Sequence, residues 1–78
     1  MVITDEIEAI WRDTLEIEDD ETVDRTKSFF ELGGNSLMAM IVIDEIQEKY
    51  NCEFEISELY ENNTIEKLGQ LVENKISE

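Results

Sequence analysis

The residues of this chain that could carry out chemistry lie together in residues 29–40, where a pair of glycines precedes Ser36. Gly33 and Gly34 allow the backbone to turn sharply or to take a positive φ. The residues after Ser36 have a helical apolar pattern, so its hydroxyl should lie at the N-terminus of a helix. Unpaired N–H groups and the positive end of the helix dipole meet there and favour an anionic group such as a phosphodiester. Ser36 is therefore a candidate attachment site for a phosphorylated prosthetic arm.

The rest of the sequence gives Ser36 no catalytic partner and the chain no metal site. A serine hydroxyl is activated by an adjacent base, and the chain contains no histidine. Residues 34–38 also lack the second glycine of the hydrolase nucleophile elbow. One cysteine without histidine cannot make a zinc site, and the acidic residues 18–21 lack the spacing of an EF-hand loop. We therefore expect no catalytic residues, no specific metal ligands and a protein that is not itself an enzyme.

Apolar spacing predicts four helices joined by one long loop. The first helix should begin after a Thr4 cap and fade near residue 16 or 17. The second should run from Ser36 to about Tyr50, the short third over residues 57–61, and the fourth from a Thr64 cap through Ile76. Residues 17–35 have no sustained period, and a loop of this length in a small domain is usually functional. We predict an all-α four-helix bundle in which residues 1–78 form a single domain.

Burial is expected at a few large apolar residues. Trp11 should be a core residue shared between helices, and Phe29 or Phe30 should be buried where the long loop returns to the core. Residues 52–56 alternate apolar and acidic side chains, which has a strand-like period. Because a lone strand has nothing to pair with, we expect an extended connector pinned by Phe54 and Ile56.

The apolar residues of the predicted second helix fall on two sides. One set recurs at i, i+3, i+4, i+7 and i+11 and should face the core. It comprises Ala39, Val42, Ile43, Ile46 and Tyr50. A second apolar group near Ser36 is accompanied by acids, so we predict a docking surface where methionine adapts to several partners and acids steer basic residues. The expected docking residues are Leu37, Met40, Ile41, Asp44, Glu45 and Glu48.

The alternative for this second side is burial against the loop of residues 17–35. For that reason we expect Leu37 to be half buried. Met40 and Ile41 are the better candidates for contact with a partner.

The composition is strongly acidic, with 21 acidic and 6 basic residues and a net charge of −15. Such a surface repels phosphate, so nucleic acid is not an expected partner. We expect docking to basic partner surfaces, and the alternative is that the charge serves only to keep a monomer in solution.

The sequence is typical of a cytoplasmic protein. The single cysteine, Cys52, cannot form an internal disulfide and is expected to be a small core or boundary residue. The N-terminus lacks the features of a signal peptide, and no apolar run approaches membrane-spanning length. We expect no membrane partner.

The glycine and serine stretch resembles the attachment motif of the acyl and peptidyl carrier proteins, whose serine carries 4′-phosphopantetheine. The resemblance covers nearly the whole chain and is closest to the thiolation domains of nonribosomal peptide synthetases and the carriers of hybrid polyketide assembly lines. Their motif, Phe-Phe-x-Leu-Gly-Gly-x-Ser-Leu, is matched at Phe29, Phe30, Leu32, Gly33, Gly34, Ser36 and Leu37. Fatty-acid carriers usually have an acid before the serine and often another two places after it, where this chain has Asn35 and Met38.

The resemblance implies carriage, with the chemistry supplied by partner enzymes. A phosphopantetheinyl transferase using coenzyme A and Mg²⁺ would join 4′-phosphopantetheine to Ser36, and the terminal thiol of the arm would hold an aminoacyl or acyl group as a thioester. The other implied partners are an adenylating or acyl-loading enzyme and condensation, ketosynthase or other tailoring enzymes.

Two alternatives to a peptidyl or hybrid carrier stay open at this point. One is a polyketide or fatty-acid type of acyl carrier. The other is an unmodified acidic helical adaptor in which Ser36 is merely an N-cap. The methionine start and the short tail suggest a free-standing protein, although an excised domain with an added methionine would look the same.

Overall fold

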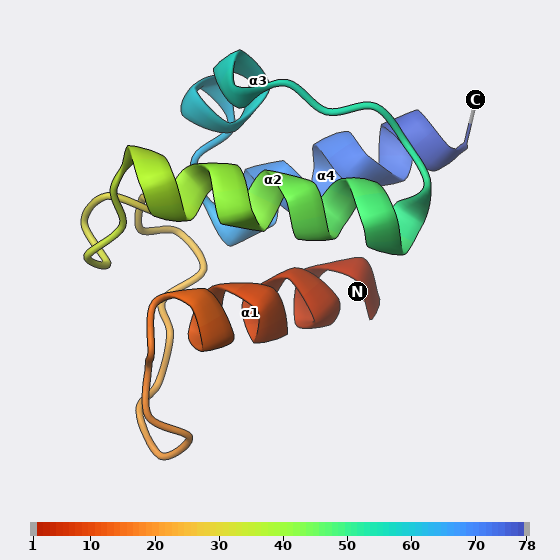
Figure 1. Cartoon of the computed structure of the whole chain (residues 1–78). Coiled ribbons are helices and arrows are strands. Elements are labelled where there is room, and N and C mark those ends of the chain that lie inside the picture. The colour runs from red at the N-terminus through yellow and green to blue at the C-terminus, as the bar shows by residue number, and fades with distance from the viewer. Residues whose placement is uncertain (1, 78) are drawn as a thin grey trace.

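Four helices, one long loop and two short connections make up residues 2–77, which the computed structural model describes. The helices are α1 (Val2–Thr14), α2 (Ser36–Tyr50), α3 (Ile56–Glu61) and α4 (Ile65–Ile76). In Figure 1, α2 and α4 run in the same direction and α1 runs opposite to both, while the short α3 lies towards the end of the molecule at which α2 begins. The described residues form no strand. The predicted all-α bundle with a long first loop and a short third helix is confirmed.

The predicted boundaries of α1 are wrong at both ends. The helix begins at Val2, so Thr4 lies inside it rather than capping it. Thr4 is buried and its hydroxyl accepts a hydrogen bond from Arg25, so this side chain serves the packing of the loop. Ile3 also packs against the core, which explains why the helix begins before Thr4. The helix ends at Thr14, and Glu16 follows with a φ of 56°.

The remaining helix ends agree well with the sequence. Asn51 ends α2 in the left-handed conformation expected of a C-cap. Thr64 caps α4, and its hydroxyl accepts a hydrogen bond from the Lys67 N–H at 3.1 Å. The third helix begins one residue early, at Ile56, with a reciprocal capping box between Glu55 and Glu58. As the first residue of α3, Ile56 is exposed, so the prediction that it pins the connector is wrong.

The core is built around two aromatic residues. Trp11 and Phe29 are fully buried and meet edge to face, with ring centroids 4.9 Å apart. The predicted core face of α2 is buried except at Tyr50, which is half buried and donates a hydrogen bond to Glu6 at 2.7 Å. The buried apolar residues are Ile7, Trp11, Val23, Phe29, Ala39, Val42, Ile43, Ile46, Phe54, Leu59, Ile65, Leu68 and Val72. Residues from all four helices and the long loop therefore share one core, and the predicted burial of Trp11 and Phe54 is confirmed.

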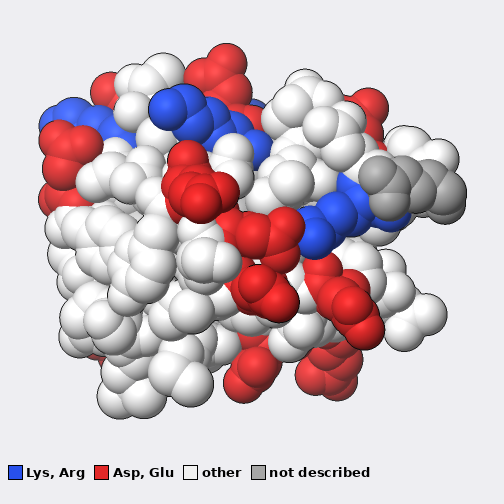
Figure 2. Space-filling model, turned by 90° about the horizontal axis from the view of Figure 1, so that it is seen from above, with Lys and Arg blue, Asp and Glu red and all other residues white. Residues whose placement is uncertain are grey.

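The surface seen from above is acidic in parts and uncharged in one broad area. Figure 2 shows Asp and Glu side chains over the middle and right of this face. It also shows an uncharged area at the lower left, on the end of the molecule at which α2 begins. The acidic surface is thus interrupted near the candidate site.

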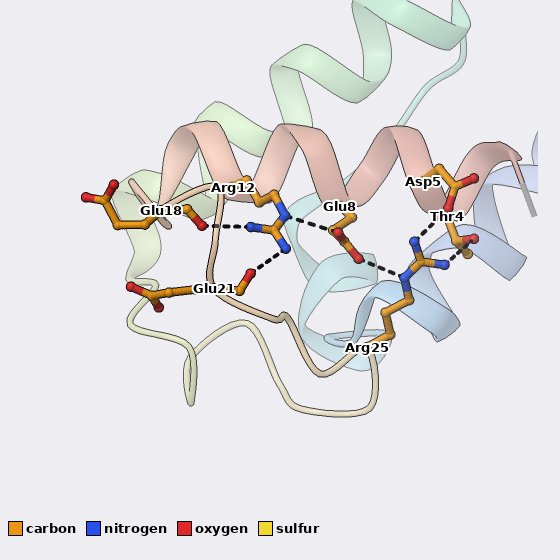
Figure 3. A network of polar contacts seen from close by, with 7 residues as sticks. All are labelled: Thr4, Asp5, Glu8, Arg12, Glu18, Glu21 and Arg25. Carbon is orange, nitrogen blue, oxygen red and sulfur yellow. Dashed lines mark hydrogen bonds and ion pairs between the residues drawn. The ribbon is translucent and has the colours of Figure 1, made fainter.

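Two arginines fasten the long loop to α1 (Figure 3). Arg25 donates hydrogen bonds to Asp5 at 2.6 Å, Glu8 at 2.8 Å and Thr4. Arg12 bonds Glu8 at 3.1 Å and the backbone carbonyls of the loop segment around residues 18–21. These hydrogen bonds hold the pKa values of the Asp5 and Glu8 carboxyl groups below their ordinary range.

The Arg25 contacts predict a pH-dependent contribution to stability. We expect Arg25→Gln to lower the midpoint of thermal unfolding near neutral pH, because Asp5 and Glu8 lose their partner. Their pKa values are lowered in the folded chain, so this contribution is complete above the unfolded carboxyl values of about 4 and is lost as the pH falls through the folded values. Thermal unfolding followed by circular dichroism from pH 7 to pH 3 measures the difference.

Lys67→Gln provides a control of the same charge change at an exposed position of α4. It should leave the midpoint close to that of the parent at each pH. A constant difference between Arg25→Gln and the parent across the pH range would contradict the role assigned to the ion pairs.

Candidate functional site

The hydroxyl of Ser36 lies in the first turn of α2, as the sequence predicts, and is exposed. The N-cap of the helix is Asn35, whose side-chain oxygen accepts a hydrogen bond from the Met38 N–H at 2.9 Å. The interpretation of Ser36 as merely an N-cap is therefore wrong. Because Asn35 performs the capping, the Ser36 hydroxyl is available for other chemistry, and its Oγ lies 3.1 Å from the hydroxyl oxygen of Tyr60.

The two glycines position Ser36 for different reasons. Gly33 has a φ of 102°, a conformation that residues with a side chain rarely adopt. Gly34 lies against the ring of Phe29, and a Cβ at this position would overlap the ring. A hydrogen bond from the Gly34 N–H to the Phe29 carbonyl, at 3.0 Å, closes the turn. The turn that precedes Ser36 therefore requires a residue without a side chain at position 34.

The apolar residues beside Ser36 are exposed. Leu37 has 69% of its surface accessible, Met40 56% and Ile41 44%. The prediction that Leu37 is half buried against the long loop is wrong. The backbone of that loop is instead bonded near α4, through the Phe29 N–H to the Asn63 carbonyl and the Glu66 N–H to the Arg25 carbonyl. The loop therefore leaves this side of α2 open.

The loop and α3 extend the uncharged area around Ser36. Phe30 is 37% exposed while Phe29 is buried, which confirms that only one of the pair enters the core. Tyr60 and Ile56 of α3 are also exposed. Tyr60 stacks on Phe30, and its hydroxyl meets that of Ser36, so these two rings border the exposed residues at the start of α2.

The acidic residues predicted for docking differ in their exposure to solvent. Asp44 and Glu48 are exposed, whereas Glu45 is half buried. Glu45 and Glu48 both line a groove with Ile10 of α1. Lys49 lines the same groove and pairs with Glu6 at 3.5 Å. Asp44 and Glu48 are thus the acids best placed to meet a partner, and the docking role of the six residues stays a prediction.

The local electrostatics fit a phosphate ester on Ser36. The first turn of α2 contains no acidic residue, although the chain has 21 of them. The N–H groups of a first helical turn have no intrahelical partner, and the helix dipole is positive there. An anionic group on the exposed hydroxyl would therefore meet favourable dipoles and no carboxylate from its own helical turn.

The sequence did not identify Tyr60 as part of this site. Its neighbours in α3 form a helix of only six residues, too short for a periodic pattern to assign its faces. Its approach to Ser36 joins positions 24 residues apart in the chain. Only the residue type of Tyr60 suggested a role in the site, because a tyrosine combines an apolar ring with a hydroxyl that donates and accepts hydrogen bonds.

The described residues offer neither a metal site nor a membrane span. Within residues 2–77, no group of three or more His, Cys, Asp or Glu side chains is arranged to hold a metal ion. None of the helices described is long and apolar enough to cross a membrane.

Comparison with known proteins identifies the family. Residues 5–72 match the family model described as "Phosphopantetheine attachment site". Polyketide synthase PksN of Bacillus subtilis (strain 168) is 34% identical over 70 residues, which are 90% of this chain and 1% of that protein. Bacitracin synthase 1 of Bacillus licheniformis is 35% identical over 66 residues, which are 85% of this chain and again 1% of that protein. The chain thus spans about one hundredth of the length of these relatives.

The fold has solved counterparts. A peptidyl carrier protein, in a structure with the phosphopantetheine transferase Sfp and coenzyme A, superposes with a TM-score of 0.85 and 26% identity, covering 94% of this chain and 91% of that chain. The family match, the relatives and the fold agree with the residues around Ser36. The chain belongs to the phosphopantetheine attachment family and is a carrier domain of the kind found in nonribosomal peptide and polyketide synthases.

Proposed function

We propose that Ser36 is the residue that bears 4′-phosphopantetheine, and that the domain carries aminoacyl or acyl groups as thioesters on the terminal thiol of this arm. The observation that supports this most is the exposed Ser36 hydroxyl in the first turn of α2, inside the segment that matches the family. Because Asn35 caps the helix, the Ser36 hydroxyl is not needed as a cap. The first turn of α2 contains no acidic residue, which favours an anionic ester on Ser36.

In the attachment step, Ser36 Oγ would form a bond to the phosphorus of coenzyme A that carries the pantetheine. The bond between this phosphorus and the bridging oxygen of the pyrophosphate would break, adenosine 3′,5′-bisphosphate would leave, and the Ser36 proton would pass to the transferase or to water. The transferase must supply the base and the Mg²⁺, because the chain contains no histidine and Ser36 contacts a phenol. We therefore propose a carrier without catalytic residues of its own.

The partners of this carrier would be a phosphopantetheinyl transferase, an adenylating or acyl-loading enzyme, and condensation, ketosynthase or tailoring enzymes. Leu37, Met40 and Ile41 would provide the apolar contact, and the neighbouring acids would attract basic partner surfaces. A small contact of this kind releases easily, which a carrier that visits several enzymes requires. The coenzyme A requirement and the single cysteine support a cytoplasmic monomer as the working form.

Loading with the prosthetic arm tests the proposal directly. Incubation with coenzyme A, Mg²⁺ and a broad-specificity phosphopantetheinyl transferase should add one phosphopantetheine to the parent protein, and Ser36→Ala should gain nothing because the attacking hydroxyl is removed. Intact-protein mass spectrometry measures the addition.

Ser57→Ala is the matched control, because Ser57 is also an exposed serine in the first turn of a helix. This variant should be modified like the parent. If a folded parent sample gains no mass while a known carrier in the same reaction does, the proposal fails and an unmodified adaptor becomes the better interpretation.

A further inference from the structure

A column of aromatic rings leads from the core to Ser36. Trp11 contacts Phe29 in the core, and Phe29 meets Phe30 edge to face with ring centroids 5.7 Å apart. Phe30 stacks on Tyr60, with ring centroids 5.4 Å apart and an angle of 15° between the planes. Tyr60 is therefore held by its ring, although it is 43% exposed. Its hydroxyl is directed to the Ser36 Oγ, 3.1 Å away.

The hydroxyl is not needed for this stacking. A phenylalanine would present the same ring face to Phe30, so the stack leaves the hydroxyl of Tyr60 free to serve another purpose. A phenol can donate one hydrogen bond and accept others. In the unmodified protein, either Tyr60 or Ser36 can be the donor of the bond between them.

Modification of Ser36 would settle the direction of this hydrogen bond. Once Oγ is an ester oxygen it has no proton, so only Tyr60 can donate. The non-bridging oxygens of the phosphodiester are bonded to the same phosphorus atom as Oγ, and they carry the negative charge. A hydrogen bond to an ionised acceptor is stronger than one between neutral groups, so the Tyr60 hydroxyl gains a better acceptor at nearly the same place.

Most of the basic side chains are already paired with carboxylates. Four of the six basic side chains already make ion pairs with carboxylates of α1 or α3. These four are Arg12, Arg25, Lys49 and Lys75. The side-chain donor that the structure places at Ser36 is the neutral hydroxyl of Tyr60.

We propose that Tyr60 is a positioning residue for the prosthetic arm, and that its hydroxyl donates a hydrogen bond to the phosphodiester on Ser36. The ring stack fixes the donor, so the bond restricts rotation of the phosphate and gives the arm a preferred direction of departure from α2. This inference rests on the proposed attachment at Ser36.

Nuclear magnetic resonance of the modified protein tests the inference without any partner activity. The parent, Tyr60→Phe and Tyr50→Phe are each converted to the phosphopantetheine form and confirmed by mass. The ³¹P resonance of Tyr60→Phe should move away from that of the parent, because the phosphate has lost a donor. Tyr50→Phe, which removes the other tyrosine hydroxyl and its bond to Glu6, should keep the parent ³¹P shift.

A second measurement needs no substitution in the sample observed. Tyrosine labelled with ¹³C at Cζ gives two resonances in the parent, and Tyr50→Phe assigns them. The Tyr60 Cζ resonance should shift on modification of Ser36 while the Tyr50 resonance stays in place. The role of Tyr60 would be overturned if the parent and Tyr60→Phe gave the same ³¹P shift and the Tyr60 Cζ resonance did not move on modification. Attachment at Ser36 would then still stand. A parent that accepts no arm would overturn both.

Discussion

Gly34→Ala is expected to destabilise the domain by about 1–3 kcal/mol, the usual cost of forcing extra volume into a packed core. The added Cβ would overlap the edge of the Phe29 ring. Phe29 can move aside only by disturbing the core, because it is fully buried and Trp11 packs against it with ring centroids 4.9 Å apart. Since whole domains are stable by only roughly 5–15 kcal/mol, this is a large effect for one methyl group.

Trp11 provides the signal for this experiment, because it is the only tryptophan of the chain and contacts the displaced ring. Urea unfolding followed by its fluorescence should give a lower midpoint for Gly34→Ala and a changed emission in the folded state. Gly33→Ala is the matched control: its φ of 102° also makes alanine strained, on the order of 1–3 kcal/mol. Apart from its two chain neighbours, no described residue has a heavy atom within 4 Å of the new Cβ, so the folded-state emission of Gly33→Ala should match that of the parent.

The two glycine variants therefore separate steric overlap from backbone strain. If Gly34→Ala unfolds at the parent midpoint with unchanged emission, Phe29 can move and the turn does not depend on a bare backbone at residue 34. If it behaves as expected, displacement of Phe29 should also reach Phe30 and Tyr60, which continue the aromatic column to Ser36.

The parts of the fold that the sequence predicts well are those decided by local interactions. The range Ser36–Tyr50 of α2 follows from its apolar period and from Asn51, and the start of α4 follows from the Thr64 cap. The core face of α2 was also predictable, because only one side repeats its apolar residues over the whole helix. For these elements, neighbouring residues carry most of the information.

Two of the wrong predictions, those for Thr4 and Leu37, share one cause, which is the path of the long loop. Thr4 looked like a cap, but it bonds Arg25 from the loop 21 residues away. Leu37 was expected to be covered by the loop, but the loop is fastened to α1 by Arg25 and near α4 by the Phe29 N–H. A segment without periodicity gives no local sign of where it will pack, so neither result could be read from the sequence.

The candidate site shows the same division. Ser36 and its place in the first turn of α2 could be predicted from the glycine pair and the helical pattern that follows. The capping by Asn35 was missed because Asn and Ser are both good N-cap residues and stand side by side. The contact of Tyr60 with Ser36 depends on the packing of α3, which the sequence alone does not place.

Met40→Lys is expected to slow phosphopantetheinylation roughly tenfold, the effect of losing about 1.4 kcal/mol at a contact residue. Met40 is 56% exposed on the open side of α2, so a lysine there would put a charge into the predicted apolar contact without disturbing the core. Initial rates of mass gain at limiting carrier concentration measure kcat/KM. Ile76→Lys makes a similar exposed replacement at the far end of α4 and should react at the parent rate (Figure 1).

Asp44→Arg separates steering from contact within the same docking surface. Long-range attraction acts on the rate of encounter and is screened by salt, so the slower reaction of Asp44→Arg should approach the parent rate as salt is added. The defect of Met40→Lys should persist, because it arises where the surfaces touch. Asp20→Arg, a charge reversal at an exposed position of the long loop, tests whether net charge alone matters.

If both Met40→Lys and Asp44→Arg react at the parent rate, the docking surface is contradicted. If Asp20→Arg slows the reaction as much as Asp44→Arg does, the acids of α2 act only through the net charge of the protein.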